Sequence, residues 1–250
     1  MSRIGTHTVA LDNRPYILAS AALGGCKETE GPLGGCFDIQ LDDDKFGEPS
    51  WEKAESKMQK ETMLKLLQKA ELAPTDIQYI FAGDLLNQCI SSSFGLRDFG
   101  IPFFGLYGAC STMAEGLSLA SMVVEGGFAS RCIALTSSHF ASAERQFRFP
   151  MEYGGQRTPT AQWTVTGSGC CIVGKSGHGP RIEAATIGKI QDYGIKDANN
   201  MGAAMAPAAV DTLQRHFRDT GLRPADYDLI VTGDLGVLGK QIVLEQMAAD

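Results

Sequence analysis

An internal repeat constrains the fold of this chain more than any other feature of its sequence. Segments 72–85 and 222–235 align without a gap at an offset of 150 residues, and 7 of their 14 positions are identical. Each copy follows a segment with apolar residues at helical spacing, 52–70 in the first and 203–220 in the second. The repeat therefore predicts a unit made of a helix, a proline-containing turn and a short buried strand that ends in Gly-Asp.

Two such units at half-chain distance predict an α/β fold of two similar halves, residues 1–175 and 176–250, each with layered helices and sheet. The alternative is that two short joints resemble each other by chance. After its repeat, the first half continues through a strand that ends near Ser137, and the second would need roughly 37 residues beyond Asp250 to match it. We therefore expect a second half that is incomplete at the C-terminus. Unpaired strands invite another chain, so we expect this form to be less stable or more associated than a longer one.

Composition excludes several classes of protein. The 250 residues are 44% hydrophobic, which is enough for a substantial core. The net charge is −7 and no long basic run occurs, so nucleic acid is not an expected partner. The apolar stretches 101–114 and 133–137 are too short or too interrupted to cross a bilayer, and residues 1–11 lack an apolar signal region. Seven cysteines without a CxxC pair predict reduced thiols. We expect no disulfide, metal site or cofactor.

Cys110 is the candidate reactive residue. Residues 101–106 have a strand pattern and residues 113–125 a helical one, so Cys110 falls where a strand turns into a helix. That position exposes a side chain and directs helix N–H groups toward it, which lowers the pKa of a thiol and favours anions. The small neighbours Gly108 and Ala109 allow a ligand to approach closely. A buried structural cysteine would have a similar composition around it, and that interpretation remains open.

Four segments carry a resemblance to a known family. The Gly-Ala-Cys-Ser turn at 108–111, within a duplicated frame, looks like the nucleophile elbow of thiolases and ketoacyl synthases. With segments 21–33, 137–140 and 156–167 it resembles the stage V sporulation protein AD family of spore-forming bacteria, over essentially all 250 residues. This resemblance implies a thiolase-like fold, a place in the SpoVA channel assembly with its membrane proteins, and binding of dipicolinate, which is pyridine-2,6-dicarboxylate.

The surroundings of Cys110 put catalysis in doubt. Condensing enzymes need a base and an oxyanion stabiliser beside the thiolate. In synthases of the ketoacyl type, one such histidine ends the strand that corresponds here to residues 230–234, where this sequence has Gly233 and Asp234. A carboxylate near a thiol raises its pKa and repels the phosphate of an acyl carrier. We therefore interpret Cys110 as a vestigial nucleophile position with no catalytic residues around it.

One histidine of the chain is a candidate partner for Cys110. The helical pattern places His216, the last histidine of the chain, on a solvated face between Arg215 and Arg218. His139 follows strand 131–137 and is the remaining candidate. The alternative is a structural, hydrogen-bonded role for this isolated histidine.

Residues 145–163 supply the groups that a flat aromatic dicarboxylate needs, namely cations, amides and aromatic rings within an irregular loop. The alternative is an exposed loop whose arginines are only solvated. The predicted ligand-binding residues are Cys110, Ser111, His139, Arg148, Arg157 and Gln162.

Three functions remain open from the sequence. The first is binding of dipicolinate, with or without calcium, by a peripheral, homo-oligomeric component on the cytosolic face of the forespore or spore inner membrane. The second is an acyl-thioester enzyme that uses Cys110 as its nucleophile. The third is a scaffold with a vestigial pocket.

Overall fold

The structure is a computed structural model that describes residues 2–147, 160–197 and 199–249. Its contacts divide the chain into two compact units. Unit 1 comprises Met1–Asp12, Gly154–Trp163 and Glu183–Asp250, and unit 2 comprises Asn13–Tyr153 and Thr164–Ile182. The halves predicted from the repeat, 1–175 and 176–250, stay a prediction, because the units follow contacts and the halves follow sequence similarity.

Unit 2 is built on a six-stranded sheet in the order β4-β3-β8-β7-β5-β6. Strand β8 is antiparallel to both of its neighbours, and the other pairs are parallel. The parallel strands therefore all point their carboxyl ends to one edge of the sheet. The strands are β3 (Tyr16–Gly24), β4 (Ile39–Gln40), β5 (Tyr79–Gly83), β6 (Phe103–Leu106), β7 (Arg131–Ser138) and β8 (Gly167–Gly174).

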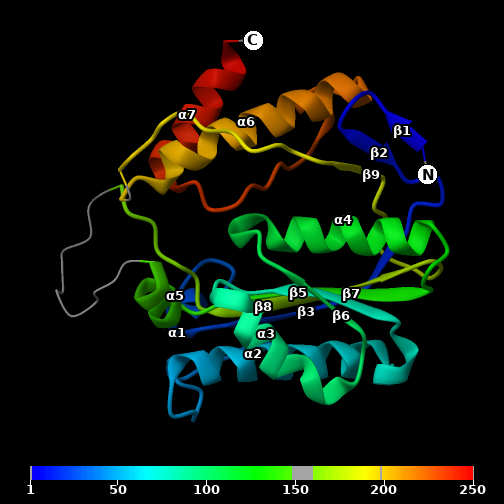
Figure 1. Cartoon of the computed structure of the whole chain (residues 1–250), viewed down its shortest axis with the longest axis vertical. Coiled ribbons are helices and arrows are strands. Elements are labelled where there is room, and N and C mark those ends of the chain that lie inside the picture. Colours follow the sequence, from blue (N-terminus) through cyan, green and yellow to red (C-terminus); the bar gives the residue numbers. More distant parts are fainter. Residues whose placement is uncertain (1, 148–159, 198, 250) are drawn as a thin grey trace. The chain divides into compact units, whose positions relative to one another are not determined.

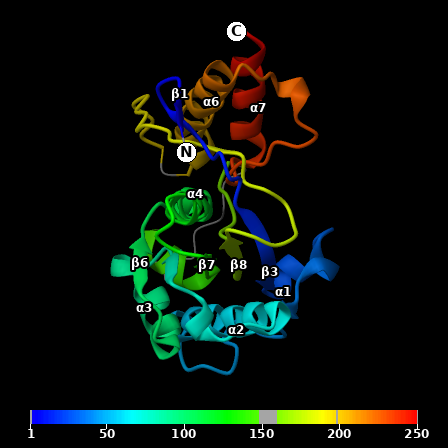
Figure 2. The ribbon, with the colours of Figure 1, turned by 90° about the vertical axis from the view of Figure 1, so that its right-hand side faces the viewer.

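Helices cover both faces of this sheet (Figures 1 and 2). Helices α2 (Trp51–Ala70) and α3 (Ile90–Leu96) lie on one face, and α4 (Thr112–Glu125) lies on the other. Neighbouring residues of β5 serve opposite layers, since Ile80 packs in the α2 core and Phe81 in the α4 core. The shorter helices α1 (Cys26–Thr29) and α5 (Phe140–Phe147) complete the described helices of the unit. The predicted layered α/β fold is thus confirmed.

Unit 1 contains a small antiparallel sheet and two long helices. Its strands are β1 (Ser2–Ile4), β2 (Thr8–Ala10) and β9 (Ala184–Thr186), and its helices are α6 (Met201–Thr220) and α7 (Gly236–Ala248). The two helices pack closely at a pair of glycines. A Cβ on Gly239 would lie 2.8 Å from the Cα of Gly202, so neither position accommodates a side chain without displacement.

The repeated helix and turn occur once in unit 2 and once in unit 1. Helices α2 and α6 each span 20 residues, and the residue after each helix, Glu71 or Gly221, is left-handed. A short 3₁₀ turn follows in both copies, at Pro74–Asp76 and Pro224–Asp226. The aspartate of each turn accepts a hydrogen bond from the first backbone N–H at 2.8 Å, from Ala73 in one copy and Arg223 in the other. The same sequence therefore forms the same local structure twice.

The predicted strand of the second copy is wrong for the described residues. Residues 227–235 form no strand, whereas β5 in the first copy pairs with β6 and β7. Leu229 and Val231 are 77% and 79% exposed, while Ile80 and Phe81 of β5 are 0% and 3% exposed. A strand has no internal hydrogen bonds, so apolar sequence alone does not form one without paired neighbours.

Candidate functional site

Cys110 lies in a tight turn between β6 and α4, as the sequence predicts. Residues Ala109–Ser111 form one 3₁₀ turn, and α4 begins at Thr112. The N–H of Gly108 donates to the hydroxyl of Thr112 at 3.2 Å, which ties the turn to the helix. Ala109 has a φ of 48°, an unfavourable conformation for a residue with a side chain. The strained turn presents the exposed thiol of Cys110 at the carboxyl edge of the sheet.

An acidic residue that was not among the predicted site residues also lies beside this turn. A Cβ on Gly108 would lie 2.7 Å from a carboxylate oxygen of Glu115, in the first turn of α4. Its position five residues after Cys110 was the available signal. The negative charge of Glu115 partly neutralises the positive end of the α4 dipole and so weakens the attraction of the helix N-terminus for anions. An acyl-carrier phosphate would meet this negative charge.

His139 occupies a different position on the same edge. It follows β7 and is 1% exposed. Its Nδ1 accepts the N–H of Ala141 at 3.1 Å, so Nε2 carries the proton and donates to the carbonyl of Asp44 at 2.5 Å. Both ring nitrogens are therefore bonded to backbone, and neither is left for a thiol. Strand β5 separates β6 from β7, which puts the strands that lead to Cys110 and His139 about 10 Å apart.

The remaining predicted residues fall in different places. Ser111 is exposed and donates its hydroxyl to the carbonyl of Gly108 at 2.8 Å. Gln162 belongs to unit 1, whereas Cys110, Ser111 and His139 belong to unit 2. Arg148 and Arg157 lie outside the described residues. The assignment of these six residues to ligand binding stays a prediction.

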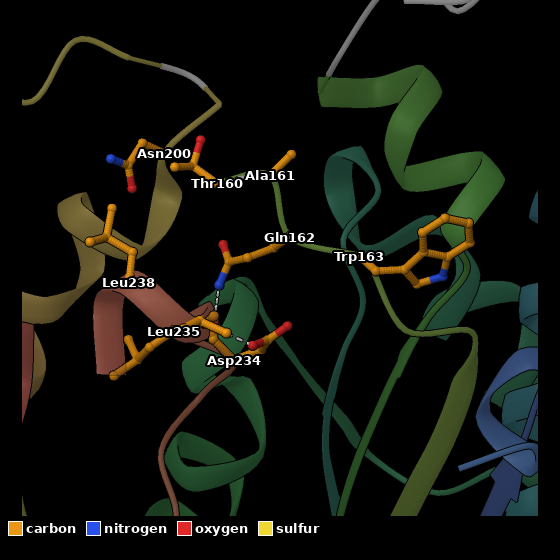
Figure 3. A pocket seen from close by; sticks show the side chains of 10 residues that line it. Thr160, Ala161, Gln162, Trp163, Asn200, Asp234, Leu235 and Leu238 are labelled. Carbon is orange, nitrogen blue, oxygen red and sulfur yellow. Dashed lines mark hydrogen bonds between the residues drawn. The ribbon is translucent and has the colours of Figure 1, made fainter. Parts of the chain in front are cut away.

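Gln162 lines a pocket of unit 1 with a volume of about 220 Å³ (Figure 3). The side-chain amide of Gln162 points toward the start of α7 and donates to the carbonyl of Asp234. Trp163 extends in another direction and forms a separate part of the wall. The residues that line the pocket are Thr160, Ala161, Gln162, Trp163, Asn200, Asp234, Leu235, Gly236, Val237 and Leu238.

Two helix N-termini border this pocket. Asn200 caps α6 by accepting the N–H of Ala203 at 3.2 Å, and Asp234 accepts the N–H of Gly236 at 2.9 Å as α7 begins. Helix N-termini favour anions, and amide and hydroxyl side chains can orient them. The carboxylate of Asp234 already occupies one of these positions. An anionic ligand must therefore displace that carboxylate or arrive with a cation that neutralises it.

The placement of His216 corrects the prediction of a solvated side chain. The ring is partly buried, because its Nδ1 lies 2.7 Å from the hydroxyl of Thr186 and its Nε2 lies 2.5 Å from that of Tyr227. Burial lowers the pKa of His216, and the charge of Asp219 partly opposes this shift. The helical pattern failed here because the strand β9 and the segment after α6 cover a face that helical periodicity assigned to solvent.

Solved structures identify the fold. The fold is similar to 3-oxoacyl-(acyl carrier protein) synthase III from Xanthomonas oryzae pv. oryzae, with a TM-score of 0.64 and 12% identity over 99% of this chain and 83% of that one. It is also similar to a variant of OleA from Xanthomonas campestris bound with cerulenin, with a TM-score of 0.70 and 14% identity over 100% of this chain and 83% of that one. The chain therefore has the thiolase-like fold.

Sequence comparison identifies the family among proteins of this fold. The profile of stage V sporulation protein AD matches residues 5–250. The stage V sporulation protein AD of Bacillus subtilis (strain 168) is 44% identical over 250 residues, which are 100% of this chain and 74% of that relative. The chain belongs to the stage V sporulation protein AD family, and its role is in sporulation. Within the described ranges, every helix is too short or too polar to cross a membrane.

Proposed function

We propose that the chain binds dipicolinate, or its calcium chelate, as a peripheral and non-enzymatic component of the SpoVA channel complex. On this proposal it works beside SpoVA membrane proteins at the cytosolic face of the forespore or spore inner membrane during sporulation and germination. Family membership supports the sporulation role, and the pocket of unit 1 supports ligand binding.

The observation that carries the proposal is the position of Gln162 between the two helix N-termini of this pocket. A flat dicarboxylate requires N–H donors for its oxygens and an apolar surface for its ring. The backbone N–H groups at the start of α7, the amide of Gln162 and the apolar wall from Leu235 to Leu238 offer both. The carboxylate of Asp234 favours a ligand that carries calcium, since the metal would neutralise the repulsion.

Calorimetric titration with dipicolinate, with and without calcium, tests this function. We expect saturable binding by the unchanged chain and weaker binding by Gln162→Ala. Gln241→Ala is the matched control, because Gln241 is an exposed amide whose side chain bonds to Glu245 within α7. Arg157→Ala should cost about 1.5–3 kcal/mol of binding energy if that cation holds a carboxylate. No heat of binding under either condition would overturn the proposal.

An acyl-thioester enzyme is the second candidate, and the exposed Cys110 on its strained turn favours it. We nevertheless expect no covalent adduct after incubation with acetyl-CoA or malonyl-CoA. The reason is that His139 has no nitrogen left to act as a base, and Asp234 stands where such enzymes have a histidine. Intact-mass spectrometry decides between the two, since stoichiometric acylation of Cys110 would replace the binding function by an enzymatic one.

We also propose that the chain forms a homo-oligomer through the edge of its larger sheet. Strand β6 is the last strand of that sheet, and Phe103 and Phe104 on it are 37% and 50% exposed. An edge strand with exposed aromatic side chains favours pairing with another strand. Light scattering of the purified chain tests this, and replacement of Phe104 by Lys should shift the mass toward the monomer. A monomer before and after the replacement would contradict the proposal.

A further inference from the structure

A chain of buried polar side chains crosses unit 2 between α2, α3 and the carboxyl edge of the sheet. The amide nitrogen of Gln59 donates to Ser92 at 2.9 Å and to Ser137 at 2.7 Å. The hydroxyl of Ser92 then donates to Asp84 at 2.6 Å, and that of Ser137 donates to Glu55 at 2.9 Å. All five residues are at most 6% exposed. Two buried carboxyl groups are thus connected through one amide and two hydroxyls.

Within this hydrogen-bond network, the direction of one hydrogen bond, that of the Ser142 hydroxyl, depends on the protonation of Glu55. Each serine hydroxyl has a single hydrogen, and those of Ser92 and Ser137 are already committed to the carboxyl groups. The hydroxyl of Ser142, in α5, has two acceptors in reach, an oxygen of Glu55 at 3.0 Å and the carbonyl of His139 at 3.2 Å. If Glu55 carries a proton, it can donate to Ser142, and Ser142 can donate to His139. If Glu55 is ionised, Ser142 must donate to Glu55 instead.

The charges around Glu55 favour the protonated form. Asp84, at the end of β5, accepts hydrogen bonds from the N–H groups of Leu86 and Ser92 in addition to the Ser92 hydroxyl, which suits a carboxylate. Glu55 lacks an ion-pair partner among the described residues, and Arg145 of α5 instead pairs with Glu52 at 2.8 Å. Burial, and then the charge of Asp84, raise the pKa of Glu55 to about 7.

The remaining groups near Glu55 compensate its charge only in part. The hydroxyls of Ser137, Ser142 and Ser91 lower the pKa of Glu55, but burial and the charge of Asp84 outweigh them. From the turn before α5, the ring of His139 is directed to the backbone of Asp44. From β8, the thiol of Cys170 faces the carbonyl of Thr62, about two helical turns from Glu55, and burial raises its pKa above the ordinary value. The fold therefore places one ionisable group in a site that suits its neutral form.

The second copy of the repeat has apolar residues at three of these positions. At the offset of 150 residues, Glu55, Gln59 and Ser92 correspond to Met205, Ala209 and Ile242. Those three side chains pack against the hydrophobic cluster between α6 and α7. An apolar interface thus joins α6 and α7, the helices of unit 1 that correspond to α2 and α3. Apolar replacement of buried ionic groups is often neutral or stabilising.

We propose that Glu55 anchors the start of α5, the helix that follows His139, only while its carboxyl group carries a proton. With its proton, Glu55 donates to Ser142, and Ser142 holds the carbonyl of His139. Loss of the proton turns Ser142 away from that carbonyl and leaves two buried carboxylates joined by one hydrogen-bond chain. The ionised form is relieved when α5 opens and water reaches Glu55, so the exposure of α5 follows the proton. This proposal does not rest on dipicolinate binding.

Hydrogen exchange of the whole chain, read by mass spectrometry on peptides from α5 and corrected for intrinsic exchange, tests the anchor. Exchange should rise by about fivefold between pH 6 and 7 and level off above pH 7, because opening releases one proton only while Glu55 still carries it. The pH range of this measurement lies above the isoelectric point of about 5.2, so the net charge of the chain keeps its sign throughout. Glu55→Gln should abolish the dependence, and the control Glu61→Gln, on the same helix, should retain it.

A second variant keeps the proposal testable if Glu55→Gln folds poorly. Ser142→Ala removes the hydroxyl whose direction depends on the proton of Glu55. The backbone of α5 should therefore exchange faster at every pH, with a smaller dependence on pH than in the unchanged chain. A pH dependence equal in the unchanged chain, Glu55→Gln and Ser142→Ala would overturn the proposal. An unchanged chain whose α5 exchanges independently of pH would overturn it as well.

Discussion

The two copies of the repeat begin with the same local structure and diverge in what surrounds it. In unit 2, Asp84 is 2% exposed and accepts three hydrogen bonds, from Leu86 and twice from Ser92. In unit 1, the carboxylate of Asp234 is exposed and, among the described residues, accepts only the equivalent of the first bond, from Gly236 at 2.9 Å. Sequence identity thus preserves the turn that aspartate makes with its own chain. Burial and neighbours decide whether the same aspartate is structural or available to a ligand.

The largest difference between the copies should appear when these aspartates are removed. Asp84→Ala leaves buried N–H and O–H groups without acceptors, so we expect a loss of about 3–5 kcal/mol in unfolding free energy. Asp234→Ala removes one exposed turn contact and should cost about 1 kcal/mol. Urea unfolding of both variants, monitored by circular dichroism, measures the two values. Equal losses would show that burial does not distinguish the copies.

The polar helix interface of unit 2 should make its stability depend on pH. Glu55 has a folded pKa of about 7 against an ordinary value of 4.5, so its contribution to stability is full below about pH 4.5 and is lost as the pH rises to 7. That difference corresponds to about 3 kcal/mol. Relative to the unchanged chain, Glu55→Gln should therefore gain stability as the pH is raised from about 5.5 to about 8. Urea unfolding at several pH values measures the gain, and a constant difference between the two chains would contradict it.

The apolar interface of unit 1 depends on close contact and not on charge. Gly239→Ala places a Cβ against the backbone of Gly202, and we expect a loss of about 1–3 kcal/mol that does not vary with pH. The control is Gly221→Ala, which has no atom within 4 Å of its Cβ position but has a φ of 72°. It should cost about 1 kcal/mol through the backbone alone. Thermal melts compare the stability losses of the two variants. If Gly239→Ala causes no loss, α6 and α7 must lie farther apart than in this structure.

The repeat and the helical patterns predicted much of the local structure, and what they missed depends on contacts between distant segments. Helices α2 and α6, the turn before Cys110 and the strand after α4 follow from periodicity, Gly, Pro and small residues, which act within a few positions. The network from Glu55 to Asp84 joins residues up to 82 positions apart through Ser137, so no local pattern marks it. His216 was misplaced for the same reason, since Thr186 contacts it from 30 residues away. The repeat also predicted a strand at 230–234, from apolar residues that form a strand only when neighbouring strands pair with them.

His216 offers the smallest and most specific test of the comparison, because the first copy has Leu66 at the corresponding position. Leu66 is fully buried in an apolar cluster, whereas His216 is held by the hydroxyls of Thr186 and Tyr227. Burial lowers the pKa of His216 below 6.5, so its neutral form stabilises unit 1 fully above pH 6.5, and this contribution falls as the pH drops further. Solvent screening of the partly exposed ring keeps the effect small. His216→Leu should remove this acid sensitivity, and nuclear magnetic resonance titration of the ring in the unchanged chain should give a midpoint below 6.5. A midpoint above 6.5 would show that Asp219, and not burial, controls the ring.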